Sequence, residues 1–336
     1  MQLQVTHETR YDYTPAVSVA QHIAYLQPLT TSRQQLLGHR LYIAPEPAQQ
    51  QVSTDVYGNS RQFFALQSAH TLLQVTATSI VATQASPPSP STMAWETVRD
   101  RLQYSAREPF DAATEFIFAS PLAPRHADFY AFAQASLTPG RSLLQVARDL
   151  MQRIHHELTY ESHSTHVNTP ALQALEQRKG VCQDFAHIMI ACLRSLGLPA
   201  RYVSGYLLTQ PAPGQTRLIG NDASHAWAAV YLPDLVDVTP SGRWHDFDPT
   251  NNRDGWGSPG EDYVTLAVGR DFADVSPIRG VIHGGAHHTL TVGVTVEPYG
   301  VYDYNAFGAL NPSSSQSQSQ TQSGSQSQSQ SQSQSP

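Results

Sequence analysis

The sequence predicts an α+β protein in which a β-rich N-terminal domain precedes a second domain of helices followed by strands. Three observations predict this class: apolar residues alternate near the start of the chain, recur at helical spacing from residue 143, and return to strand-like runs after residue 200. At 336 residues the chain is long enough for two domains, each with its own core.

We expect residues 1–85 to form the β-rich domain. Apolar and polar residues alternate around Leu3 and Val5, and the pattern returns at 41–43 and 73–77. A period of two is typical of a strand with one buried face. Residues 86–94 include the run Ser-Pro-Pro-Ser-Pro, which cannot continue a strand or a helix, so we expect a linker there.

The second domain is expected to span residues 95–310 and to begin with helices. Apolar residues recur every three or four positions over 143–158, which predicts a helix. Thr169 as the cap and Pro170 as the first helical residue predict a short helix that Gly180 ends.

A third helix is expected over 182–196, because it carries an apolar stripe and is followed by the stop signals Gly197 and Pro199. Strands are expected to follow it. The predicted strands are 201–208, 225–232, 243–248 and 289–297. Residues 311–336 repeat serine and glutamine, so we expect a disordered tail.

Charge and hydropathy argue against two classes of partner. The net charge is −7 and no cluster of Lys or Arg occurs, so we expect no nucleic-acid partner. No apolar run approaches the roughly 20 residues that a membrane-spanning helix needs, so we expect no membrane partner. The N-terminus lacks the basic start and apolar stretch of a secretory signal, and we therefore expect a cytoplasmic protein.

Neither a metal nor a cofactor is expected. The two cysteines, Cys182 and Cys192, match no zinc pattern. Two groups of histidines have no cysteine or acidic residue at the spacing that metal ligands require. These are His163 with His166, and His283 with His287 and His288.

Cys182 is the candidate nucleophile. It begins the third predicted helix just after Gly180, where unpaired backbone N–H groups and the helix dipole favour a thiolate. Asp184 is expected to complement the same helix end. The alternative is that Cys182 is a small buried apolar residue, as many cysteines are. A catalytic role requires a base within reach of its sulfur.

His225 and Asp248 are the candidate partners of this cysteine. If residues 225–232 and 241–248 form an antiparallel hairpin, the two side chains lie directly opposite, about 4.5–5.5 Å apart at Cβ. A carboxylate in that place holds the imidazole in one tautomer and stabilises its charged form. Asp246 competes for the same role. The ordinary interpretations are a histidine buried in the core and an aspartate in a strand-ending turn.

Three segments in this order resemble the transglutaminase-like core: Gly-Val-Cys-Gln-Asp at 180–184, Ser-His-Ala-Trp at 224–227 and Asp-Phe-Asp-Pro-Thr at 246–250. The resemblance implies a papain/transglutaminase-like core of helices packed on an antiparallel sheet. It also implies that Cys182 is the nucleophile, His225 the base and Asp248 the orienting acid. Residues 5–17, 55–59 and 266–281 resemble the bacterial subgroup with an N-terminal β domain.

The resemblance implies an enzyme that transfers the acyl group of a protein or peptide amide through a thioester intermediate. A cysteine protease or amidohydrolase with water as the acceptor is the alternative, and a binding module without catalysis is the second class. Animal transglutaminases carry a tryptophan before the nucleophile, whereas none occurs here between Trp95 and Trp227, so the second oxyanion donor is unidentified. The glutamine-rich tail is either inert or a substrate in cis.

Overall fold

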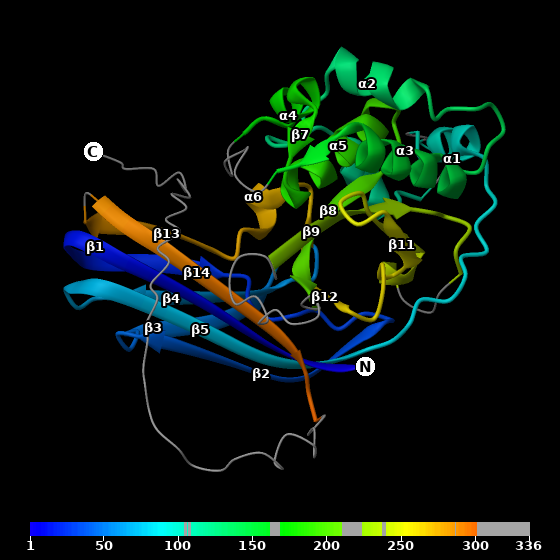
Figure 1. The fold of residues 1–336 in the computed structure, drawn as a ribbon. Coiled ribbons are helices and arrows are strands. Elements are labelled where there is room, and N and C mark those ends of the chain that lie inside the picture. The colour runs from blue at the N-terminus through cyan, green and yellow to red at the C-terminus, as the bar shows by residue number, and fades with distance from the viewer. Residues whose placement is uncertain are drawn as a thin grey trace, which may run out of the picture.

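The computed structural model describes residues 1–103, 106, 109–161, 169–209, 224–236, 240–285 and 287–300. The predicted tail at 311–336 lies outside these residues, as do His163 and His166. Figure 1 shows a β domain on one side of the molecule and a layer of helices over a second sheet on the other. The predicted α+β class is confirmed.

The β domain is built around the long strand β1, in a seven-stranded sheet. The first half of β1 pairs with β5 and β14, and its second half pairs with β4 and β13. The strands are β1 (Gln2–Ala24), β2 (Gln34–Ala44), β3 (Gln49–Thr54), β4 (Ser60–Leu66), β5 (His70–Thr83), β13 (Ile278–Gly284) and β14 (His287–Pro298). The alternation predicted over 73–77 is confirmed, because Leu73, Val75 and Ala77 are buried in the core of this domain.

Residues 95–310 were expected to form one domain, but strands β13 and β14 within this range join the sheet of the N-terminal domain. Leu3 to Thr14 of β1 pair in continuous register with Pro298 to His287 of β14. The predicted strand at 289–297 is therefore present, but it belongs to the sheet of the N-terminal domain. Alternation reveals a strand and its buried face, whereas the choice of partner depends on contacts distant in the sequence.

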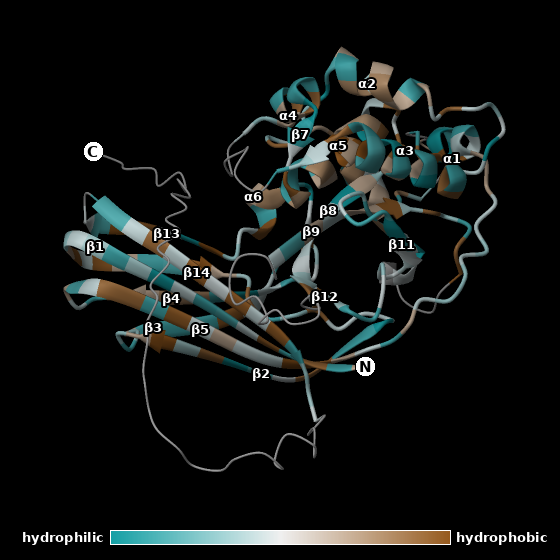
Figure 2. Cartoon of the chain, viewed as in Figure 1, coloured by the Kyte–Doolittle hydropathy of each residue, from teal (hydrophilic) through white to brown (hydrophobic). Residues whose placement is uncertain are grey.

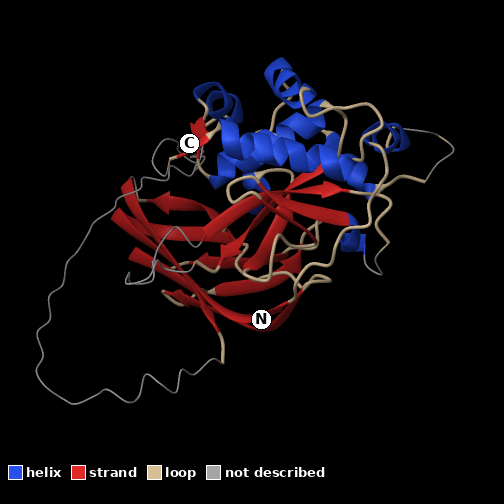
Figure 3. Cartoon of the chain, turned by 45° about the vertical axis from the view of Figure 1, so that its right-hand side comes forward, coloured by secondary structure: helices blue, strands red, loops and turns tan. Residues whose placement is uncertain are grey.

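The second domain has helices packed over a five-stranded antiparallel sheet of order β11-β10-β9-β8-β12 (Figure 3). The strands are β8 (Ala200–Leu207), β9 (Ser224–Tyr231), β10 (Trp244–Asp248), β11 (Arg253–Trp256) and β12 (Tyr263–Gly269). The α-helices are α1 (Trp95–Arg101), α2 (Ala127–Gln134), α3 (Leu143–Glu157), α4 (Ala171–Gln177), α5 (Cys182–Ser195) and α6 (Phe272–Val275). Two 3-10 helices at Ala112–Ile117 and Pro240–Arg243 and a small parallel pair, β6 (Thr159–Tyr160) with β7 (Lys179–Gly180), complete it.

Helix α5 is the central helix of this domain. All its residues from Asp184 to Arg194 are buried, and Figure 2 colours much of its ribbon as hydrophobic. It ends close to the predicted position, before Gly197, whose φ of +77° lies in the left-handed region that favours glycine. No helix among the described residues is both long and apolar enough to span a membrane.

Helix α4 differs from the prediction at both ends. Pro170 is the residue before the helix rather than its first residue. The helix ends at Arg178, whose φ of 54° is left-handed, and Gly180 lies in β7 instead. An arginine can occupy this conformation, although glycine does so more readily, so the glycine alone did not locate the helix end.

Two amide side chains of the β domain attach it to the free edge of β12. Gln34 bonds to both the N–H and the C=O of Thr265, each at 2.8 Å. Asn59 likewise bonds to the C=O of Val268 at 2.7 Å and to its N–H at 2.8 Å. Each amide imitates a neighbouring strand, so the β domain supplies the hydrogen bonds that an edge strand lacks.

Candidate active site

Cys182 is the first residue of α5, and its side chain is partly exposed, whereas Cys192 on the same helix is buried. The Asp184 carboxylate accepts a hydrogen bond at 2.9 Å from the backbone N–H of Val181, which satisfies one unpaired donor of the helix end. A Cβ on Gly180 would lie 2.8 Å from Asp184 Oδ2, so this position has room only for glycine. The structure thus gives Asp184 the expected role at the start of α5.

His225 and Asp248 form a buried hydrogen-bonded pair. The distance between His225 Nε2 and Asp248 Oδ2 is 2.7 Å. Asp248 is fully buried, and His225 exposes 8% of its surface. The side chain of Cys182 interacts electrostatically with the same imidazole. Because Nε2 is engaged by the carboxylate, Nδ1 is the nitrogen left to face the sulfur. The structure brings the three predicted residues together.

The predicted register of this pair was wrong by two residues. Asp246 pairs with Ala229 and Phe247 with Ala228, so continuing the register puts Asp248 opposite Trp227. Residues 240–243, which overlap the start of the strand predicted over 241–248, form a 3-10 turn instead, and β10 begins at Trp244. A shift by two keeps both side chains on the same face of the sheet, and His225 becomes a diagonal neighbour of Asp248.

Asp248 accepts hydrogen bonds on both carboxylate oxygens. Oδ1 accepts the backbone N–H groups of Thr250 at 2.9 Å and of Asn251 at 3.3 Å. Oδ2 accepts the Asn251 side-chain amide and the Tyr263 hydroxyl, each at 2.7 Å, in addition to His225. Sequence reasoning missed Asn251 and Tyr263. Asn251 directly follows the Asp-Pro-Thr segment, and this adjacency could have identified it. No signal in the sequence pointed to Tyr263 on a distant strand.

The electrostatics of the pair favour an ion pair. Burial opposes a charge on His225, but the adjacent Asp248 carboxylate and the Cys182 side chain outweigh it and raise the pKa of His225 to about 10. Burial likewise disfavours the Asp248 anion, yet His225, Asn251 and Tyr263 hold its pKa below the ordinary value. An imidazolium that is stabilised beside a cysteine sulfur stabilises the thiolate in turn.

Asp246, the competing carboxylate, pairs with a different group. Its Oδ1 accepts the indole N–H of Trp227 at 2.8 Å. Burial raises the pKa of Asp246 to about 6, against the opposing effect of Arg201. The Trp227 ring lies 6.1 Å from the His225 ring between centroids, so Asp246 is linked to the site through the indole.

Gly205 makes room for the aromatic rings around His225. It pairs directly with His225 across β8 and β9. A Cβ at this position would overlap the Trp227 indole and the carbonyl oxygen of Val264. Tyr263 packs on the same indole with its ring perpendicular, at 5.4 Å between centroids. The missing side chain therefore leaves room for the indole on which Tyr263 packs.

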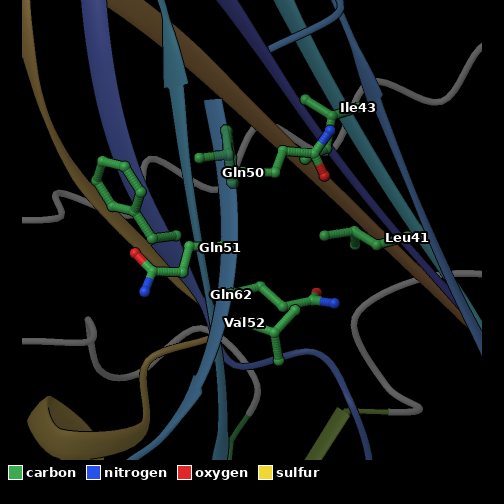
Figure 4. Close-up of a pocket in the computed structure, with 8 residues that line it drawn as sticks. Leu41, Ile43, Gln50, Gln51, Val52 and Gln62 are labelled. Atoms are coloured by element: carbon green, nitrogen blue, oxygen red, sulfur yellow. The ribbon is translucent and has the colours of Figure 1, made fainter. Parts of the chain in front are cut away.

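His283, His287 and His288 lie on strands β13 and β14 of the β domain. His283 contacts the hydroxyl of Ser18 in the β domain at 3.0 Å, and within the described ranges no group of three or more His, Cys, Asp or Glu has the geometry to hold a metal. A pocket in the β domain contains none of the predicted site residues (Figure 4). Its lining comes from β2, β3 and β4: Leu41, Ile43, Gln50, Gln51, Val52, Gln62, Phe63 and Phe64.

Comparison with known proteins gives two family matches. Residues 130–249 match the transglutaminase-like superfamily, and residues 3–82 match the bacterial transglutaminase-like N-terminal region. An uncharacterised protein of Mycobacterium tuberculosis is 40% identical over 306 residues, which cover 88% of this chain and 92% of that protein. The chain belongs to the bacterial transglutaminase-like family. The match to the transglutaminase-like core includes Cys182, His225 and Asp248.

Two further comparisons concern the sequence and the fold. An uncharacterised protein of Mycobacterium leprae is 30% identical over 297 residues, covering 88% of this chain and 98% of that protein. A crystal structure of a candidate cysteine protease from Cytophaga hutchinsonii matches with a TM-score of 0.64 and 23% sequence identity. The match covers 88% of this chain and 90% of the Cytophaga chain. The latter similarity establishes the shared two-domain fold.

Proposed function

We propose that this protein is a cysteine acyltransferase that acts on protein or peptide amides, with Cys182 as nucleophile, His225 as base and Asp248 as orienting acid. The observation that carries the proposal is the buried hydrogen bond of 2.7 Å between His225 Nε2 and Asp248 Oδ2, with the Cys182 side chain acting electrostatically on the same imidazole. Membership of a transglutaminase-like superfamily supports the same assignment.

The reaction would proceed in two steps. The Cys182 thiolate attacks the amide carbonyl, and the carbon–nitrogen bond breaks as the His225 imidazolium gives its proton to the leaving amine. The acyl group is then a thioester on the sulfur. In the second step, neutral His225 takes a proton from the incoming acceptor, which attacks the thioester and releases the thiolate. The backbone N–H of Cys182 is one donor for the oxyanion of both steps.

The acceptor distinguishes two candidate activities. A primary amine as acceptor gives transamidation, and water gives a peptidase or amidohydrolase. The absence of a tryptophan between Trp95 and Trp227 in the sequence departs from the animal transglutaminases and favours hydrolysis as the second candidate. A cytoplasmic location belongs to this proposal and is supported by Cys182 and Cys192, both of which are free thiols.

A peptide library incubated with and without a labelled primary amine tests the proposal. Transamidation incorporates the label into a glutamine-containing peptide, whereas hydrolysis gives glutamate or a cleaved peptide. The variant Cys182→Ala is expected to abolish either product, and Cys192→Ala, which removes a thiol of the same helix outside the site, is expected to retain it. Product formation that survives Cys182→Ala would contradict the proposed nucleophile.

A further inference from the structure

The diagonal placement of His225 leaves Asp248 with a demanding geometry. Diagonal neighbours across an antiparallel pair are about 7–8 Å apart, against about 4.5–5.5 Å for directly opposed residues. An aspartate side chain is short, so only a few of its conformations keep the carboxylate 2.7 Å from His225 Nε2. The two backbone N–H groups of the following turn fix only Oδ1. The oxygen that meets the imidazole is Oδ2.

Two side chains hold Oδ2 in place. We propose that Tyr263 and Asn251 are positioning residues that keep the Asp248 carboxylate ionised and directed at His225. This inference rests on the proposed function of the site. Each donates a hydrogen bond of 2.7 Å to Oδ2. They approach from different elements, because Tyr263 begins β12 and Asn251 lies in the turn after β10.

Tyr263 is itself held rigidly. Its side chain is buried with 1% exposure and packs against the Trp227 indole. The guanidinium of Arg253 lies over its ring at 4.8 Å and forms two hydrogen bonds to Asp262, at 2.6 and 2.7 Å. A buried phenol without competing water gives a hydrogen bond of fixed direction. The hydroxyl therefore donates its hydrogen bond to the Asp248 carboxylate rather than to solvent.

Asn251 contacts both members of the buried pair. Its side-chain nitrogen lies 2.7 Å from Asp248 Oδ2 and 3.3 Å from His225 Nε2. Both nitrogens therefore lie around the same carboxylate oxygen, which accepts the amide N–H and the Nε2–H. The carboxylate favours the state in which Nε2–H points at it, and that state leaves Nδ1 for the sulfur.

The charged and titratable groups around Asp248 come from three strands. His225 faces it from β9, Tyr263 from β12, and Arg253 directly opposite it on β11. Asp262 is paired with Arg253. Loss of the Tyr263 hydroxyl or the Asn251 amide removes a donor that favours the anion, so Asp248 takes up a proton at a higher pH.

The test is the pH dependence of alkylation of Cys182 by iodoacetamide in the full chain, followed by mass spectrometry. In Tyr263→Phe and in Asn251→Ala, we expect the acidic limb of the rate profile to move up by about one pH unit, which corresponds to one lost hydrogen bond to a charged group. Tyr231→Phe is the matched control. It removes a hydroxyl that donates to Asp111 at 2.7 Å, at the other end of β9 from His225, and its profile should equal that of the wild type.

The outcomes separate this inference from the function on which it rests. If the rate profiles of Tyr263→Phe and Asn251→Ala both superimpose on those of the wild type and Tyr231→Phe, the positioning role is wrong. The proposed function would not be affected by that result. A wild-type profile that follows a free thiol, with reactivity rising only near about pH 8.5, would contradict the proposed function and the positioning role together.

Discussion

Replacing Asp248 with asparagine removes one charge from the buried pair and leaves its shape nearly unchanged. The carboxylate accepts two backbone N–H groups on Oδ1 and three side-chain donors on Oδ2. An amide has only one accepting oxygen, and its NH₂ group replaces the other. Even when the amide oxygen takes the place of Oδ2, the two backbone donors face the NH₂ group and lose their acceptor. At about 1–3 kcal/mol for each unsatisfied donor, the variant should lose at least about 2 kcal/mol of stability to unfolding.

The same substitution should return His225 to its neutral form. Asp248 is the group that overcomes burial and raises the pKa of His225 to about 10 from an ordinary 6.5. Without that charge, burial dominates and the pKa should fall below 6.5. A fall of this size corresponds to about 5 kcal/mol of lost stabilisation of the imidazolium, and we expect the rate of acyl transfer to fall by roughly 10³ or more.

Titration of the imidazole signals by NMR measures this effect, with the His225 resonance assigned from its loss in His225→Gln. The control is Asp254→Asn, which neutralises a second, partly buried His–Asp pair, His245 Nε2 to Asp254 Oδ2 at 2.8 Å, on the neighbouring strands. It should leave the titration of His225 unchanged. If His225 in Asp248→Asn still titrates as it does in the wild type, the proposed electrostatic role of Asp248 is refuted.

Three further predictions concern the support of the site. Gly205→Ala should destabilise the fold by about 1–3 kcal/mol and lower activity, because the added methyl overlaps the Trp227 indole next to the His225 imidazole. Urea denaturation measures the loss of stability, and peptide turnover measures the loss of activity. Asn59→Ala should lower stability by about 2–4 kcal/mol, because the buried N–H and C=O of Val268 lose their partners; an unchanged urea midpoint would contradict this. His7 and His22 are neutral in the fold because burial lowers the pKa of each to about 4. The unfolded chain therefore binds more protons than the fold below about pH 6.5, and stability should drop as the pH falls from 6.5 to 4, by on the order of 3 kcal/mol per histidine, as denaturation at several pH values would show.

Local signals predicted the elements of the site well. The helix that begins at Cys182 was expected because a glycine, an apolar stripe and a Gly-Leu-Pro stop coincide there, and the structure has it within one residue at its end. The strands that carry His225 and Asp248 were expected at 225–232 and 243–248, and the structure has them at Ser224–Tyr231 and Trp244–Asp248. These features depend on residues close in the sequence, which is why propensity and period reveal them.

Long-range features were the ones that sequence reasoning missed. The register of β9 against β10 depends on a 3-10 turn at Pro240–Arg243, so the pairing of His225 with Asp248 was right on the face and wrong by two residues. Tyr263 reaches Asp248 from the far edge of the sheet, past two strands, which no local pattern encodes. The return of β14 to β1 is likewise set by the assembled fold.

The central claim is that Cys182 is the nucleophile and that His225 activates it. The rates at which iodoacetamide alkylates Cys182 and Cys192, measured at one pH in the wild type and in His225→Gln, test this without any substrate. We expect Cys182 to be labelled much faster than the buried Cys192 in the wild type, and its labelling to slow in His225→Gln. Labelling of Cys182 that is no faster than that of Cys192, or that is unchanged in His225→Gln, would contradict the account.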